Sequence, residues 1–147
     1  MNNNSFVRTV LLLAAGVAIG FIGRGMLQEN GSSSRGNSAD QPQFDFIVGG
    51  PDRFWDQVIA GAKAAADEFD IDLRVHVPSG KPVDQTEVLG RVEAKGTDGV
   101  AISPIAPVDQ TLLLSRLATR THLITFENDA PQSLRHCYVG TNNYTAG

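Results

Sequence analysis

The chain has 147 residues, one cysteine and a formal net charge of −4, from 12 basic and 16 acidic residues. This length suits one domain of ordinary size, and the lack of a clustered basic face argues against a nucleic-acid partner. A single cysteine, Cys137, excludes an internal disulfide, and three scattered histidines without Cys/His ligand spacing argue against structural zinc.

Residues 1–27 are predicted to form a secretory signal or a membrane anchor. A polar start with one basic residue, Arg8, is followed by the uncharged apolar run 10–22. This run is shorter than the roughly 20 residues of a bilayer span and fits the apolar region of a signal peptide. No small-x-small cleavage site or lipoprotein cysteine follows it, so a cleaved signal and a retained anchor both stay open. Residues 28–43, rich in Gly, Ser, Asn and Gln, predict a flexible linker.

The body of the chain predicts an α/β fold with a doubly wound parallel sheet. Strands are expected over 44–49, 71–77, 99–103, 122–126 and 137–140, and helices over 53–69, 82–95 and 107–119. Pro107 suits a first helical turn, and Gly96 suits a helix end. Strands that alternate with helices are joined by right-handed crossovers, which makes neighbouring strands parallel.

Polar and aromatic residues gather where these strands are predicted to end. Open parallel sheets bind ligands beyond the carboxyl ends of their strands. Aromatic rings cover the apolar face of a sugar, while carboxylates and amides bind its hydroxyls. The candidate ligand-binding residues at these ends are Asp52, Phe54, Trp55, Glu127, Asn128 and Asn142.

The residues after the first strand each have a structural alternative. Asp52 could cap the following helix, since Asp is a favoured N-cap residue. Trp55 belongs to the apolar stripe of that helix, so core packing is the stronger reading of it. Phe54 lies off the stripe and is the better candidate for stacking on a ligand.

The later strand ends are weighed in the same way. Glu127 directly follows an apolar strand, where an unpaired buried carboxylate would be costly, which favours a ligand or a polar network. Asn128 and Asp129 could form a plain turn, and Asn142 could cap a helix. Ser103 is expected only to end its strand.

Enzyme chemistry is disfavoured at these strand ends, and no cofactor is expected. The first strand is followed by GGPDRFW, which lacks the GxGxxG dinucleotide fingerprint. The sequence has no phosphate loop ending in Gly-Lys-Ser/Thr and no GxSxG elbow, and Ser103 stands where a phospho-acceptor carboxylate would be.

Four segments in order resemble the type I periplasmic sugar-binding proteins, the ribose, galactose and xylose receptors of ABC importers. They are FIVGGPDRFWDQVIAGAKAAADEF, KGTDGVAISPIAP, LITFENDAP and YVGTNNYTAG. The resemblance covers residues 44–147 and implies the N-terminal lobe of a two-lobed receptor, with the second lobe absent. In that family a polar residue and two aromatics after the first strand hold the sugar, matching Asp52, Phe54 and Trp55. The family's Asp-Arg pair after the fourth strand matches Glu127 and Asn128, and a position after the fifth matches Asn142.

The resemblance implies an extracytoplasmic solute-binding component of a sugar ABC importer. Its partners would be a monosaccharide and an ABC permease or membrane receptor, with the membrane reached through the N-terminal segment if that segment is retained. Two alternatives stay open, a membrane-anchored sugar sensor and a truncated fragment that does not bind sugar. A cytoplasmic repressor would need a DNA-reading helix-turn-helix where the apolar leader stands.

Overall fold

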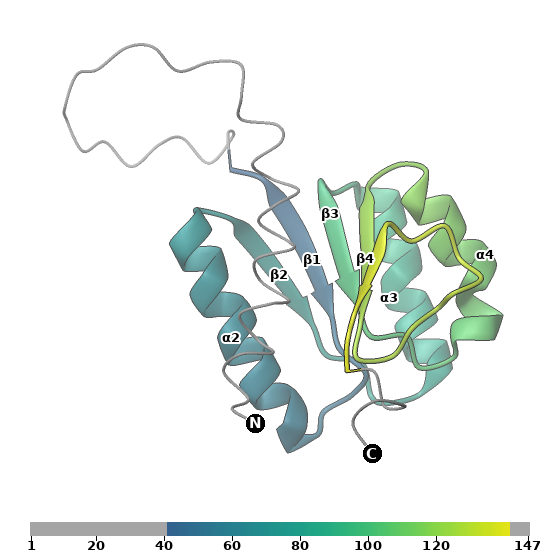
Figure 1. The fold of residues 1–147 in the computed structure, drawn as a ribbon, viewed down its shortest axis with the longest axis horizontal. Helices are drawn as coiled ribbons and strands as arrows, with labels where there is room; N and C mark the ends of the chain where they lie inside the picture. The colour runs from purple at the N-terminus through teal and green to yellow at the C-terminus, as the bar shows by residue number, and fades with distance from the viewer. Residues whose placement is uncertain (1–40, 142–147) are drawn as a thin grey trace, which may run out of the picture.

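A computed structural model describes residues 41–141, in which strands and helices alternate (Figure 1). Within them the elements are β1 (Gln43–Ile47), α2 (Arg53–Phe69), β2 (Asp72–His76), α3 (Pro82–Lys95), β3 (Gly99–Ile102), α4 (Pro107–Ala118), β4 (His122–Phe126) and β5 (Cys137–Val139). The predicted leader and apolar helix lie outside the described residues. Over residues 41–141, no helix has both the length and the apolar character needed to cross a membrane.

The strands form one sheet in the order β2-β1-β3-β4-β5, and every neighbouring pair is parallel. This confirms the predicted fold class. The chain builds outward from β1 in one direction to β2 and in the other direction through β3 to β5. The strand order therefore reverses between β1 and β3, where Ile47 pairs with Ile102. Such a switch point opens a crevice at the carboxyl ends of the strands.

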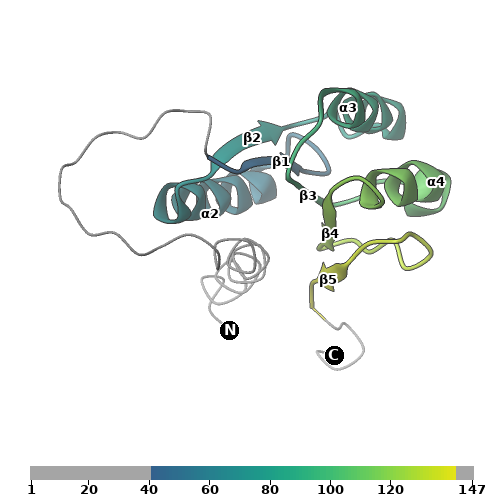
Figure 2. The same cartoon turned by 90° about the horizontal axis from the view of Figure 1, so that it is seen from above.

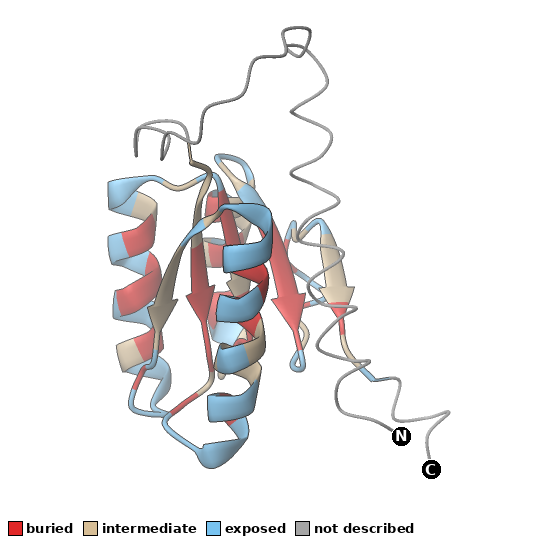
Figure 3. Cartoon of the chain, turned by 90° about the vertical axis from the view of Figure 1, so that its left-hand side faces the viewer, coloured by how far each residue is buried: buried red, intermediate tan, exposed pale blue. Residues whose placement is uncertain are grey.

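Helices cover both faces of the sheet, with α2 on one face and α3 and α4 on the other (Figure 2). Alternation along β1 sends Ile47 into the core under α3 and α4, and sends Phe46 and Val48 into the core under α2. Figure 3 shows the buried residues concentrated along the central strands and on the inward sides of the helices. A parallel sheet needs this double cover, because both of its faces are apolar.

Local signals place the helix ends. The bounds of α2 and α3 match the prediction, and α3 begins at Pro82 and ends before Gly96, whose φ of 80° suits glycine. Four of the five predicted strands run one or two residues past the carboxyl end of the observed strand, whereas the prediction for β4 matches its bounds. Phe69, the last residue of α2, is 36 % exposed.

One charged group interrupts the apolar core of β1. Asp45 is 2 % exposed, and its two carboxylate oxygens lie 2.7 Å from Arg74 Nη2 and 2.6 Å from His76 Nε2 on β2. Burial by itself would raise the pKa of Asp45. The hydrogen bond with His76 and the charge of Arg74 outweigh it, so the pKa of Asp45 lies below its usual value. This cluster ties the edge strand β2 to the centre of the sheet.

Candidate ligand-binding site

The carboxyl ends of the parallel strands lie at one edge of the sheet, and predicted site residues gather there. The rings of Phe54 and Trp55 meet edge to face, with centroids 4.9 Å apart. Trp55 in turn meets Phe126, the last residue of β4, at 6.1 Å. Glu127 follows Phe126 directly, so an aromatic chain connects the start of α2 to the carboxylate after β4.

Trp55 and Phe54 occupy different environments at the start of α2. Trp55 is 7 % exposed and belongs to the core under α2, whereas Phe54 is 54 % exposed. A Cβ at Gly49 would lie 2.8 Å from Cζ2 of Trp55, so only glycine after β1 leaves room for the indole. The buried indole therefore supports an exposed phenyl ring that can cover a ligand.

Asp52 occupies the N-cap position of α2 with extended backbone, but its side chain makes no capping hydrogen bond. Only its carbonyl oxygen is used, accepting a hydrogen bond from the Trp55 N–H at 2.9 Å. The predicted capping role thus falls to the backbone. The exposed carboxylate lies in the loop at the carboxyl end of β1.

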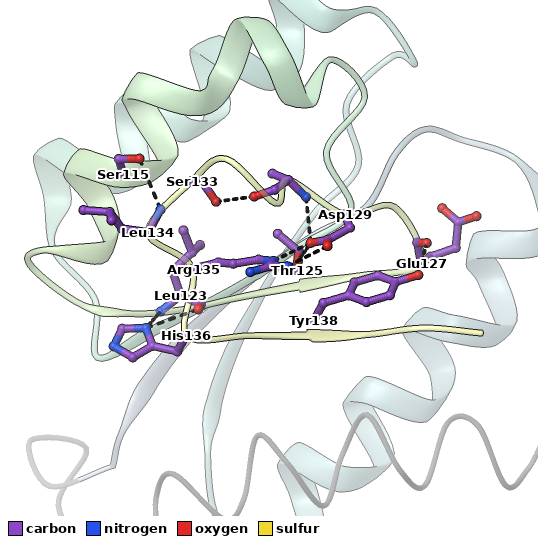
Figure 4. Close-up of polar contacts among 11 residues, drawn as sticks. Ser115, Leu123, Thr125, Glu127, Asp129, Ser133, Leu134, Arg135, His136 and Tyr138 are labelled. Atoms are coloured by element: carbon purple, nitrogen blue, oxygen red, sulfur yellow. Dashed lines mark hydrogen bonds and ion pairs between the residues drawn. The ribbon is translucent and has the colours of Figure 1, made fainter. Parts of the chain in front are cut away.

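Glu127 adopts left-handed backbone with a φ of 62°, which is unusual for a residue other than glycine. Neighbours on β5 hold it there, and Figure 4 shows one of them, Tyr138. Its N–H donates to the Val139 carbonyl at 3.0 Å, and its own carbonyl accepts from the Tyr138 hydroxyl at 2.8 Å. Ser103, at the end of β3, donates to Glu127 Oε2 at 3.1 Å. Ser103 therefore does more than end its strand, contrary to the prediction.

The Tyr138 hydroxyl is suited to remain a donor. Burial raises the pKa of Tyr138, and the negative charges of Asp129 and Glu127 raise it further. The phenol is therefore protonated at neutral pH and can hold the carbonyl of Glu127.

The loop between β4 and β5 is braced by Asp129. Its carboxylate accepts hydrogen bonds of 2.7 Å from the Thr125 hydroxyl, the Ala130 N–H and Arg135 Nη2, and a further one from Arg135 Nε. Hydrogen bonding to Arg135 holds the pKa of Asp129 below its usual value, although partial burial works against this. Asp129 is therefore part of an ion-paired loop and not a plain turn residue. Asn128, beside it, is exposed.

Comparison with known proteins identifies the family of this domain. A family model described as a periplasmic binding protein domain matches residues 46–147. The chain belongs to this family.

Solved structures of the periplasmic binding protein family agree with this assignment. The chain is 28 % identical to an ABC transporter solute-binding protein from Burkholderia graminis in complex with D-arabinose, with a TM-score of 0.70 over 75 % of this chain and 39 % of that one. It is 28 % identical to GanP, a glucose-galactose binding protein from Geobacillus stearothermophilus, with a TM-score of 0.66 over 73 % of this chain and 39 % of that one. The chain thus spans about two fifths of the length of these relatives. No curated protein matches the sequence.

In this periplasmic binding protein domain, the predicted site residues have different placements. Ring contacts connect Phe54 and Trp55 to Phe126, the residue before Glu127, at one edge of the sheet. Asp52 and Asn128 are exposed in the loops there. Asn142 lies outside the described residues.

Gln85 on α3 is a positioning residue that the sequence analysis missed. Its side chain is fully buried, and its amide donates to the carbonyls of Val48 at 3.1 Å and Ser103 at 2.9 Å. Its oxygen accepts from the Ile105 N–H at 2.9 Å and from Gln110 Nε2 at 3.0 Å. One amide thereby joins the segments that leave β1 and β3, on the two sides of the switch point.

Proposed function

We propose that this chain provides one wall of a monosaccharide-binding site in an extracytoplasmic solute-binding protein of an ABC importer. The observation that carries the proposal is an exposed aromatic ring, Phe54, at the same sheet edge as a carboxylate, Glu127, whose backbone is fixed by neighbouring strands. Sugar-binding relatives in the same family support the ligand class.

Phe54 would stack against the apolar C–H face of the sugar ring. A half-exposed phenyl ring among polar loops offers such a surface, and the buried Trp55 behind it limits its movement. In this proposal Trp55 contributes mainly by supporting Phe54 and by its edge at the floor of the site.

Carboxylates and amides would bind the sugar hydroxyls. Glu127 Oε2 already accepts from Ser103, and residues 41–141 supply no hydrogen bond to Oε1, which can accept from a hydroxyl. Asp52 and Asn128 offer further polar groups at the same edge, and Asn142 stays a predicted contact beyond the described residues.

The rest of the proposal follows from this role. The chain would bind rather than transform its ligand, and it would present the sugar to an ABC permease or to a membrane receptor. Export through residues 1–27, as a signal or as an anchor, remains a prediction.

The test is to titrate the 147-residue chain with D-arabinose, D-ribose, D-xylose, D-galactose and D-glucose. Changes in the NMR chemical shifts of the backbone amides report binding and its location. For one wall we expect dissociation constants of about 1 mM or weaker, which corresponds to a binding free energy of at most about 4 kcal/mol in magnitude. Phe54→Ala should weaken binding by about 1–2 kcal/mol, or about 5- to 30-fold, through the loss of ring contact. Glu127→Gln should also weaken it, because a charged acceptor is lost.

Phe69→Ala is the matched control, because Phe69 is also exposed on α2 but lies at the opposite end of that helix. It should bind as the unmodified chain does. Equal affinities of Phe54→Ala and Phe69→Ala, or shifts that map away from the strand ends, would contradict the proposed site.

A further inference from the structure

Two histidines lie together at the amino ends of β4 and β5, opposite the candidate ligand-binding site at the carboxyl ends of the strands. His122 is the first residue of β4, and His136 immediately precedes β5. Both are exposed, and their ring centroids are 5.3 Å apart with the ring planes tilted by 55°. Figure 4 shows His136 at the far end of this region from Glu127 and Tyr138.

The separation of the two rings matches that of imidazoles on a shared metal ion. A metal–nitrogen bond of about 2.0–2.1 Å places each ring centre about 3.2 Å from the ion, and tetrahedral geometry then puts the two centres roughly 5.2–5.4 Å apart. The observed 5.3 Å falls within this range. The tilt means that the two rings do not stack face to face.

The backbone of Leu123 holds the His136 ring in place. Nδ1 of His136 lies 3.1 Å from the Leu123 N–H and 3.3 Å from the Leu123 carbonyl oxygen. Nδ1 can therefore accept from the first group or, when protonated, donate to the second. A histidine that binds a metal through Nε2 carries its proton on Nδ1, so metal binding would exchange the hydrogen bond from the Leu123 N–H for one from Nδ1–H to the Leu123 carbonyl oxygen.

From this geometry we propose that His122 and His136 form a two-histidine site for a divalent transition-metal ion such as Zn²⁺ or Cu²⁺. Imidazole nitrogens suit these ions, and water would complete the coordination. Within residues 41–141 no group of three or more metal-ligating side chains gathers. The site is therefore open and exchangeable, unlike the closed structural zinc site that the sequence argues against.

The test is calorimetric titration of the untagged 147-residue chain with ZnCl₂, with electron paramagnetic resonance of added Cu²⁺ to count nitrogen ligands. We expect one Zn²⁺ site and two coordinated imidazoles. His122→Ala should weaken Zn²⁺ binding by about tenfold or more, since the second ligand is already held beside the ion. His136→Ala should have the same effect and leave one nitrogen in the Cu²⁺ spectrum.

The chain offers a matched control in His76, its only other histidine. Nε2 of His76 lies 2.6 Å from a carboxylate oxygen of Asp45 on β1. His76→Gln should leave Zn²⁺ affinity unchanged. His122→Ala decides the matter if replacing His136 disturbs the contact with Leu123, and melting curves will show whether it does. Unchanged Zn²⁺ affinity in His122→Ala, or a single imidazole on Cu²⁺ in the unmodified chain, would overturn the proposal without bearing on sugar binding.

Discussion

Replacing Gln85 with alanine should be among the most damaging single changes in this domain. The substitution removes four hydrogen bonds from a fully buried amide. It leaves two carbonyls, those of Val48 and Ser103, and one N–H, that of Ile105, without their side-chain partner. Gln110 retains a weaker contact with the Thr86 hydroxyl at 3.4 Å.

The expected loss of stability follows from the free energy needed to bury polar groups without hydrogen-bond partners. Each orphaned buried donor or acceptor costs about 1–3 kcal/mol, and the truncation also leaves a cavity. Relaxation and entry of water into the cavity will recover part of this. We therefore expect Gln85→Ala to lower the free energy of unfolding by about 3–5 kcal/mol, a large share of the roughly 5–15 kcal/mol of a typical domain.

Urea unfolding can measure this change through the fluorescence of Trp55, the only tryptophan in the chain. Trp55 lies in the core under α2, so unfolding transfers it to water. Gln57→Ala is the matched control, because Gln57 is exposed on α2, and it should shift stability by no more than about 0.5 kcal/mol. Gln85→Leu restores the volume but not the hydrogen bonds, so it should remain strongly destabilised. A cost below about 1 kcal/mol for Gln85→Ala, or recovery in Gln85→Leu, would refute this reasoning.

Two further predictions concern the polar contacts that fix the strand ends and the edge strand. Tyr138→Phe removes the donor to the Glu127 carbonyl and should lower the free energy of unfolding by about 0.5–1.5 kcal/mol in the same urea assay, and unchanged stability would argue against that bond. Asp45→Asn should cost about 1–3 kcal/mol at pH 7, because the pKa of Asp45 is lowered in the folded state by His76 and Arg74 against the effect of burial. A lowered pKa stabilises the fold above the unfolded-state pKa of about 3.9, and this contribution is lost as pH falls through the folded-state pKa. The difference in free energy of unfolding between the two proteins should therefore stay constant from pH 7 to about pH 5 and shrink as the pH falls below about 4. A difference that does not change with pH would contradict the assignment.

The fold could be predicted because its signals are local. Apolar periodicity in α2 and residues that begin or end helices, such as Pro82, Gly96 and Pro107, mark the elements in the sequence itself. Strand ends were less accurate because apolar side chains continue past the ladder. Val48 is fully buried, yet it lies beyond the last residue of β1.

The site could be predicted only in part, because much of it depends on tertiary contacts. The exposure of Phe54 followed from its place off the apolar stripe that contains Trp55. Gln85 did leave a signal, since it shares a helical stripe with Val88, Leu89 and Val92, and a polar residue on a buried stripe needs partners. The pairing of Asp129 with Arg135 left no comparable signal, because it depends on how the loop between β4 and β5 folds.

The conformation of Glu127 links the fold to the proposed function. Left-handed backbone at a residue other than glycine costs about 1–3 kcal/mol and persists only where surrounding contacts determine it. Here the backbone contacts come from β5 through Tyr138 and Val139, and Ser103, directly after β3, holds the carboxylate. The carboxylate is therefore positioned before any ligand arrives, by strands that the rest of the core already holds. Binding at this wall would not require this loop to become ordered, and a site fixed in advance loses less conformational entropy when it captures a small ligand.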